Sequence, residues 1–129
     1  MGNIYSAQNV AAYLIYELNG KNSFINSYSL QDLLAEIDKL WYKNFGHTAF
    51  KEETGSTSEG GYYVKEVFDA YKEFENRHLF LPAKEWHLEY GQFQLVLRPY
   101  AVPLFTAMEL LLINDVLSEF HKYAAKRAS

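Results

Sequence analysis

The sequence contains no cysteine among its 129 residues. Disulfide bonds, thiolate nucleophiles, cysteine-ligated zinc and iron–sulfur clusters are therefore excluded. Proline is scarce, with three residues, and no apolar run approaches the roughly 18 residues of a membrane-spanning helix. No basic region followed by an apolar stretch opens the chain, so no secretory signal is visible. We expect a cytoplasmic protein that does not act at a membrane.

The chain also lacks a large net charge of either sign. Its 12 basic and 16 acidic residues give a net charge of −4. Binding to phosphates needs a concentrated basic face, so we expect no nucleic-acid partner. Aromatic residues, by contrast, make up 17% of the chain. Disordered chains have few aromatics and excess charge. Composition and length therefore predict one folded domain over residues 1–129.

The first six residues, MGNIYS, fit the pattern of a myristoylation signal, with glycine second and serine sixth. Ser6 also has the position of a helix N-cap, because apolar residues repeat behind it at helical spacing. We favour the cap, with Gly2 incidental and not lipidated. The helix is expected to end at Asn19 or Gly20, which tolerate the left-handed conformation.

Two further helices are indicated before residue 75. The second is predicted to begin at Ser29, because Ser29 to Asp32 resembles a capping box with aspartate in place of glutamate. Leucines and other apolar residues then repeat at three- and four-residue spacing, and Gly46 is expected to end the helix. Residues 46–61 are predicted to form a loop with Phe50 as its only anchor. The third helix is predicted to begin near Tyr63, with one face made of Val64, Val67, Phe68, Tyr71 and Phe74.

Between residues 86 and 98 the apolar period changes from that of a helix to that of a strand. Gly91-Gln92 suits a two-residue hairpin turn. The expected cross-strand pairs are Trp86–Leu97, Leu88–Leu95 and Tyr90–Phe93, which share one face that should lie on the helices. The apolar segment from Leu104 to Ile113 predicts a central helix. The fold class is therefore mainly α (α+β), a compact helical domain of four or five helices with one β-hairpin near residues 86–98.

The chemistry-bearing residues do not combine into a known catalytic or metal-binding pattern. None of the four histidines pairs with another at the spacing of a chelating helix or strand. His87-x-Glu89 is similar to a deaminase fragment, but that site also needs two cysteines. No Walker loop, nucleophile elbow or dinucleotide fingerprint is present. We expect no catalytic residue, no metal and no cofactor.

A protein-binding surface is the function that the residues favour, because tyrosine is common at interfaces and several tyrosines fall outside the predicted apolar stripes. The alternative is that some of these tyrosines pack under the hairpin. The sequence also leaves a homodimer open. The candidate partner-binding residues lie in the loop and the start of the third helix, where we expect them to be exposed: Glu59, Gly60, Gly61, Tyr62, Tyr63 and Lys65.

Four stretches of the chain recur together in a known order and spacing: YSAQNVAAYLI at 5–15, SLQDLL at 29–34, LWY at 40–42 with Gly46, and Gly60 or Gly61 followed by Val64, Val67, Phe68, Ala70, Tyr71 and Lys72. Over residues 4–75 they resemble, in order and spacing, the Panacea domain, the phage-associated GepA-like family of antitoxin type. The family's Gly-Pro is Gly61-Tyr62 here, and Ala35-Glu36 replaces an aromatic pair.

This resemblance implies a mostly helical, non-enzymatic domain that neutralises or adapts a protein partner by direct contact. Such a partner is the toxin of a toxin–antitoxin system or another protein, and members are associated with phages and mobile elements. One alternative is a phage-encoded inhibitor of a host defence or regulatory protein. A second alternative is a small enzyme of unknown reaction.

Overall fold

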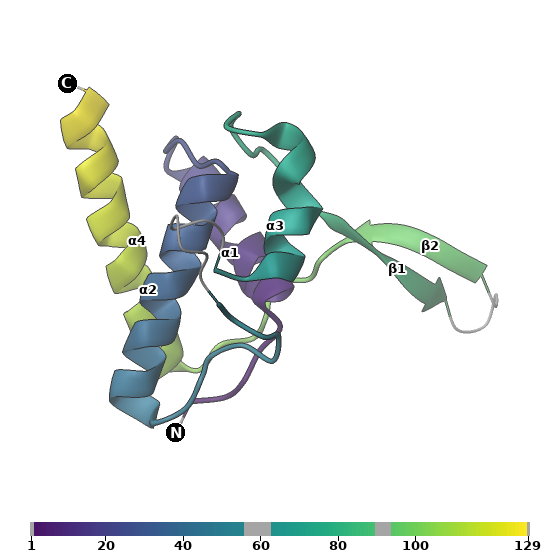
Figure 1. The fold of residues 1–129 in the computed structure, drawn as a ribbon, viewed down its shortest axis with the longest axis horizontal. Coiled ribbons are helices and arrows are strands. Elements are labelled where there is room, and N and C mark those ends of the chain that lie inside the picture. Colours follow the sequence, from purple (N-terminus) through teal and green to yellow (C-terminus); the bar gives the residue numbers. More distant parts are fainter. Residues whose placement is uncertain (1, 56–62, 90–93, 129) are drawn as a thin grey trace.

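The computed structural model describes residues 2–55, 63–89 and 94–128. Helices dominate, and one antiparallel hairpin follows the third of them (Figure 1), so the predicted mainly α class with one β-hairpin is confirmed. The elements are α1 (Ala7–Gly20), α2 (Ser27–Phe45), α3 (Lys65–Tyr71), the short 3₁₀ helix η1 (Lys72–Phe74), β1 (Lys84–Glu89), β2 (Gln94–Pro99) and α4 (Ala107–Ala128).

The ends of α1 and α2 show how local sequence signals work in this chain. Ser6 is the N-cap of α1, as predicted, and its hydroxyl accepts from the Gln8 N–H. The predicted start of α2 at Ser29 is wrong, because Asn26 is the N-cap and the helix begins at Ser27. The side chains of Asn26 and Ser29 each accept from the other's backbone N–H, which makes Ser29 the third helical residue of a reciprocal cap. Gly46 ends α2 with φ of +79°, as expected.

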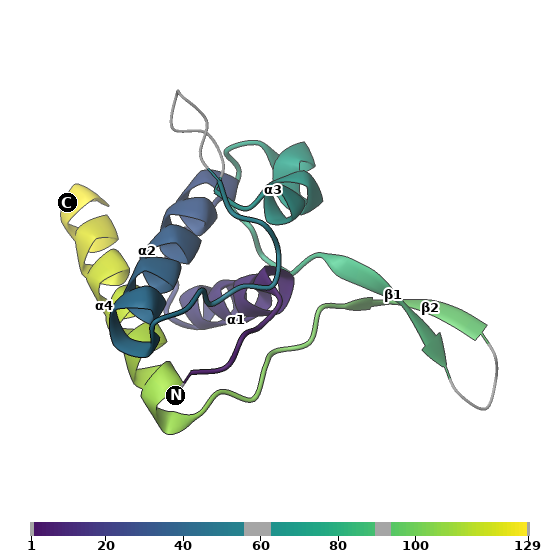
Figure 2. The same cartoon turned by 60° about the horizontal axis from the view of Figure 1, so that its bottom comes forward.

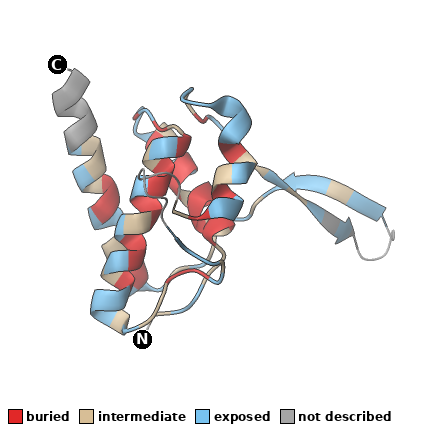
Figure 3. Cartoon of the chain, in the orientation of Figure 1, coloured by how far each residue is buried: buried red, intermediate tan, exposed pale blue. Residues whose placement is uncertain are grey.

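The core lies where α1, α2, α3 and α4 turn their apolar sides toward one another (Figure 2; Figure 3). Trp41 of α2 is buried in it, and Phe50 anchors the following loop, as predicted, but it is not the only anchor, because Ala49 is buried too. The loop is also tied to the amino-terminal segment, because Tyr5 donates to Ala49 O and accepts from the Lys51 N–H. One short parallel bridge therefore joins the amino-terminal segment to the loop that follows α2.

Two helical predictions need correction. α3 is only seven residues long and tightens into η1, so Phe74 lies on the surface and not on the buried face. The helix predicted from Leu104 is not central, since α4 begins at Ala107 and buries only the side that faces its neighbours. Leu104 and Leu111 are exposed, because no described segment covers the outer side of this apolar stretch.

The hairpin has the predicted register but not the predicted position. Trp86 pairs with Leu97 and Leu88 with Leu95, whereas the expected turn and its pair Tyr90–Phe93 lie outside the described residues. The strands extend away from the helices (Figure 1; Figure 2), so the expectation that their apolar face lies on the helices is wrong. The helices fill the core with their own side chains, and the chain leaves that core after the buried Leu79.

Candidate functional site

The predicted partner-binding segment is only partly described. Glu59, Gly60, Gly61 and Tyr62 lie outside the described residues. Lys65 is exposed at the start of α3, and its Nζ lies 2.8 Å from Asp69 Oδ2 one turn further on.

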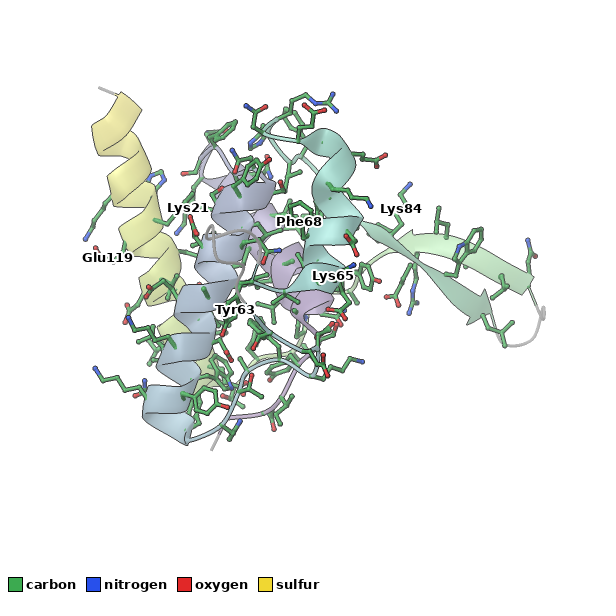
Figure 4. The ribbon with its side chains drawn as sticks, in the orientation of Figure 1. Lys21, Tyr63, Lys65, Phe68, Lys84 and Glu119 are labelled. Atoms are coloured by element: carbon green, nitrogen blue, oxygen red, sulfur yellow. The ribbon has the colours of Figure 1, made fainter. Side chains whose placement is uncertain are left out.

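Tyr63 departs from the expected exposure, because it is half-buried and its phenol turns toward α2 (Figure 4). The hydroxyl donates to Asp38 Oδ2 at 2.7 Å. Burial and this hydrogen bond raise the pKa of the Tyr63 phenol. Tyr63 therefore attaches the segment before α3 to α2. Of the two described candidates, only Lys65 projects into solvent.

Gln31 of α2 positions the chain just before α3. Its buried amide oxygen accepts from the N–H groups of Tyr63 and Val64 at 2.8 and 2.7 Å, and its Nε2 donates to Val64 O at 3.1 Å. On the other side, Gly55 donates its N–H to Tyr63 O at 2.8 Å. The Gln31 side chain thus makes the hydrogen bonds that a neighbouring strand would otherwise make to residues 63 and 64. The hydrogen bond from Gly55 holds Gly55 and Tyr63 next to each other.

Asp38 is a buried carboxylate that accepts three hydrogen bonds. Thr48 Oγ1 and the Ala49 N–H donate to its Oδ1 at 2.8 and 2.7 Å, and Tyr63 donates to Oδ2. All three donors belong to segments that cross α2 without being part of a helix. Buried carboxylates need such donors. Asp38 therefore fastens two loops to α2.

Glu109 of α4 does the same for the amino-terminal segment. It is fully buried and accepts from the Asn3 N–H at 2.7 Å, the Tyr5 hydroxyl at 2.5 Å and the Thr106 N–H at 2.7 Å. Burial acts to raise the pKa of this carboxyl, but the hydrogen bonds from Asn3, Tyr5 and Thr106 outweigh it and lower the pKa. Sequence reasoning missed this group, although Thr106-x-x-Glu109 is a capping-box pattern at the start of a helix.

The described histidines that make polar contacts with other elements serve the same structural purpose. His78 Nδ1 accepts from the Ile25 N–H at 3.1 Å, so its Nε2 carries the proton and donates to Asn19 Oδ1 at 2.8 Å. His121 Nδ1 is hydrogen-bonded to the Ser23 hydroxyl. Within the described part of the chain, no three His, Asp or Glu side chains are grouped so that they could hold a metal ion. No described helix is both long and apolar enough to cross a membrane.

One face of the hairpin is an uncovered apolar feature. Cross-strand pairing and strand alternation place four large side chains on it. We call Trp86, Leu88, Leu95 and Leu97 the hairpin face; they are 68%, 41%, 62% and 51% exposed. The opposite face carries Glu85 paired with Arg98. The hairpin is therefore amphipathic, with its apolar side toward solvent.

A groove of about 700 Å³ opens at the root of the hairpin, between α3–η1 and the segment that leads to β1. Phe80 and Leu81 line it and are 71% and 68% exposed. Lys84 at the start of β1 (Figure 4) is also among the lining residues, and alternation along β1 puts it on the same face as Trp86. The hairpin face and the groove therefore adjoin. Together, the hairpin face, Phe80 and Leu81 form what we call the docking surface.

The root of the hairpin is fixed to the helical body by two hydrogen bonds. The Ala83 N–H donates to the Tyr71 hydroxyl at 2.8 Å, and the Tyr100 N–H donates to Ala83 O at 3.0 Å. Burial raises the pKa of Tyr71 to about 12, so this phenol stays protonated at neutral pH. The docking surface is thus presented by a strand pair whose base is anchored in the core.

Comparisons of this chain with protein-family models, with curated proteins and with solved structures find no match.

Proposed function

We propose that this chain is a non-enzymatic protein-binding module that holds its partner on the docking surface. The observation that carries this proposal is the hairpin face, where a tryptophan and three leucines lie side by side and no described part of the chain covers them. A contiguous exposed apolar patch of this kind marks an interaction site more often than a bare surface. Tryptophan is also among the residues that dominate binding energy.

The limited stability of an uncovered hairpin also favours the binding of a partner. A two-stranded hairpin is only marginally stable in water unless another layer covers its apolar face. Burying a leucine side chain fully contributes about 1.5–3 kcal/mol. A protein that covers the hairpin face would therefore stabilise the strands and gain affinity from the same contacts.

The buried carboxylates favour binding over catalysis. Asp38 and Glu109 are each engaged by three donors from loops and termini. These hydrogen bonds fasten segments of the chain to helices, which gives both carboxylates a structural role. Both groups are accounted for by the fold.

We further propose an antitoxin-like role in the cytoplasm, in which the chain neutralises or adapts a protein by direct contact. The resemblance of residues 4–75 to the Panacea domain supports this role, and the absence of cysteine suits a reducing compartment. Lys65 and the neighbouring residues 59–62 remain proposed as additional partner contacts.

Affinity capture from native lysate of the source organism tests the binding function. The comparison uses wild type, a Trp86→Ser/Leu97→Ser variant and a Tyr42→Ser control, in which an exposed aromatic residue of α2 is removed. We expect wild type and control to recover the same protein and the hairpin variant to lose at least about 90% of it, as for a hot spot. Equal recovery by the hairpin variant would rule out the docking surface, and no specific recovery by wild type would rule out the function.

A further inference from the structure

The occupant of the docking surface can be argued from its area, its chemistry and its symmetry. We propose that a second copy of this chain covers it, with the two hairpin faces packed against each other around a two-fold axis. This inference rests on the proposed function, because it names the partner of the same surface.

The exposed area is close to what a stable dimer buries. With roughly 200 Å² for a fully exposed large apolar side chain, the exposed fractions of the six residues correspond to about 700 Å². Standard interfaces bury about 800 Å² per partner. The hairpin face alone supplies about 450 Å² on the same basis, which falls short. Phe80 and Leu81 at the groove are therefore needed to complete the interface.

The chemistry of the surface is that of an interface centre. The hairpin face is made of Trp86 and three leucines, while Glu85, Gln94, Val96 and Arg98 lie on the opposite side of the strands. Lys84 lies between the hairpin face and the groove, whose lining also includes Glu73 and Arg77. The hairpin face itself carries no charge, so its apolar side chains are complementary to a copy of themselves.

Two-fold closure also explains how such a face can be stable in solution. When the same patch meets its copy, the contact is complete with two chains and does not propagate. Two facing hairpins form four strands in two layers about 10 Å apart, which covers each apolar face with another. The Glu85–Arg98 sides remain in water.

The test is the molar mass of the purified full-length chain, measured by light scattering and sedimentation over a wide concentration range. We expect twice the chain mass of 15.0 kDa, with dissociation on dilution. Leu95→Glu places a charge on the hairpin face and should weaken the dimer on the order of a hundredfold. Leu111→Glu is the matched control, because Leu111 of α4 is 61% exposed and lies outside the docking surface.

Quenching of Trp86 fluorescence supplies a second readout, since Trp41 is buried in the core. Shielding of Trp86 that is lost on dilution, or in Leu95→Glu, supports the dimer, provided that circular dichroism shows unchanged helix content. A mass of 15.0 kDa at every concentration overturns it, as does a dimer that Leu111→Glu dissociates and Leu95→Glu does not. Monomeric protein that still captures a foreign partner through Trp86 and Leu97 would overturn the dimer and retain the proposed function.

Discussion

At the residue scale, three buried polar side chains form the hydrogen bonds to backbone groups that other backbone groups usually form. Gln31 pairs with the chain at residues 63–64 as a strand would, and Asp38 and Glu109 collect N–H and hydroxyl donors from loops. Each side chain satisfies groups that would be costly to bury alone. The irregular segments of this small domain therefore depend on single side chains in helices.

Gln31→Leu should destabilise the protein strongly. The change keeps the volume but leaves the N–H groups of Tyr63 and Val64 without their acceptor. Two unsatisfied buried donors correspond to a loss of about 2–4 kcal/mol in the free energy of unfolding, measured by urea denaturation. Glu36→Leu, on the exposed side of α2, is the control and should change it by less than about 0.5 kcal/mol. A similar effect of both changes would contradict the role of Gln31.

Glu109 should make stability depend on acidic pH. Its pKa in the folded protein lies below the ordinary value of 4.5, so the carboxylate stabilises the fold at neutral pH. This contribution is present above pH 4.5 and is lost as the pH falls from there through the lower pKa of the folded state. Urea titrations at decreasing pH should show a smaller decline for Glu109→Gln than for wild type. Glu119→Gln, on the exposed side of α4, should keep the wild-type decline.

At the scale of elements, the hairpin shows the difference between register and placement. Alternation of large apolar residues and the two-residue turn expected at Gly91-Gln92 together predicted the pairs Trp86–Leu97 and Leu88–Leu95. What the face covers depends on how the connections at Leu79 and Phe105 leave and re-enter the core. Those directions arise from packing between distant segments, which a local pattern does not contain.

Tyr71→Phe should loosen the hairpin without unfolding α3. The ring remains to fill the core, but the Ala83 N–H loses its acceptor. We expect a loss of about 1–2 kcal/mol and faster hydrogen exchange at the amides of Ala83 and Tyr100. Exchange within α1 should follow only the change in global stability.

The same variant has an alkaline signature. Because the pKa of Tyr71 rises from 10 to about 12 on folding, its contribution to stability is present below pH 10 and is lost as the pH rises toward 12. Tyr71→Phe should remove this part of the alkaline decline. Unchanged exchange at Ala83 together with an unchanged alkaline decline would show that the phenol does not anchor the hairpin.

At the scale of the whole molecule, the sequence predicted the class of fold and the elements better than their contacts. Ser6 and Gly46 carry their signals in their own chemistry, so the predicted helix ends were confirmed. Asn26 was missed because Ser29 offered an equally plausible cap. The apolar stretch after Leu104 hid the Thr106–Glu109 cap, since it was interpreted as buried on all sides.

The candidate surface was predictable only in kind. An excess of aromatic residues favoured an interface, but Tyr63 is used to fasten the chain to Asp38. Trp86 and its leucines were expected inside, and their exposure depends on the tertiary position of the hairpin. Which apolar face a small domain leaves open is decided by the packing of all its layers together.

The hydrogen bond between Gly55 and Tyr63 has a consequence for how this chain tolerates change in length. Gln31 and Asp38 secure Tyr63 from the helical side, so both ends of the intervening stretch have fixed anchor points. The entropy cost of closing a chain between two fixed points grows slowly with its length, by about 0.6 kcal/mol for each doubling. With both anchor points held by the helices, we expect residues inserted between positions 55 and 63 to leave the free energy of unfolding nearly unchanged.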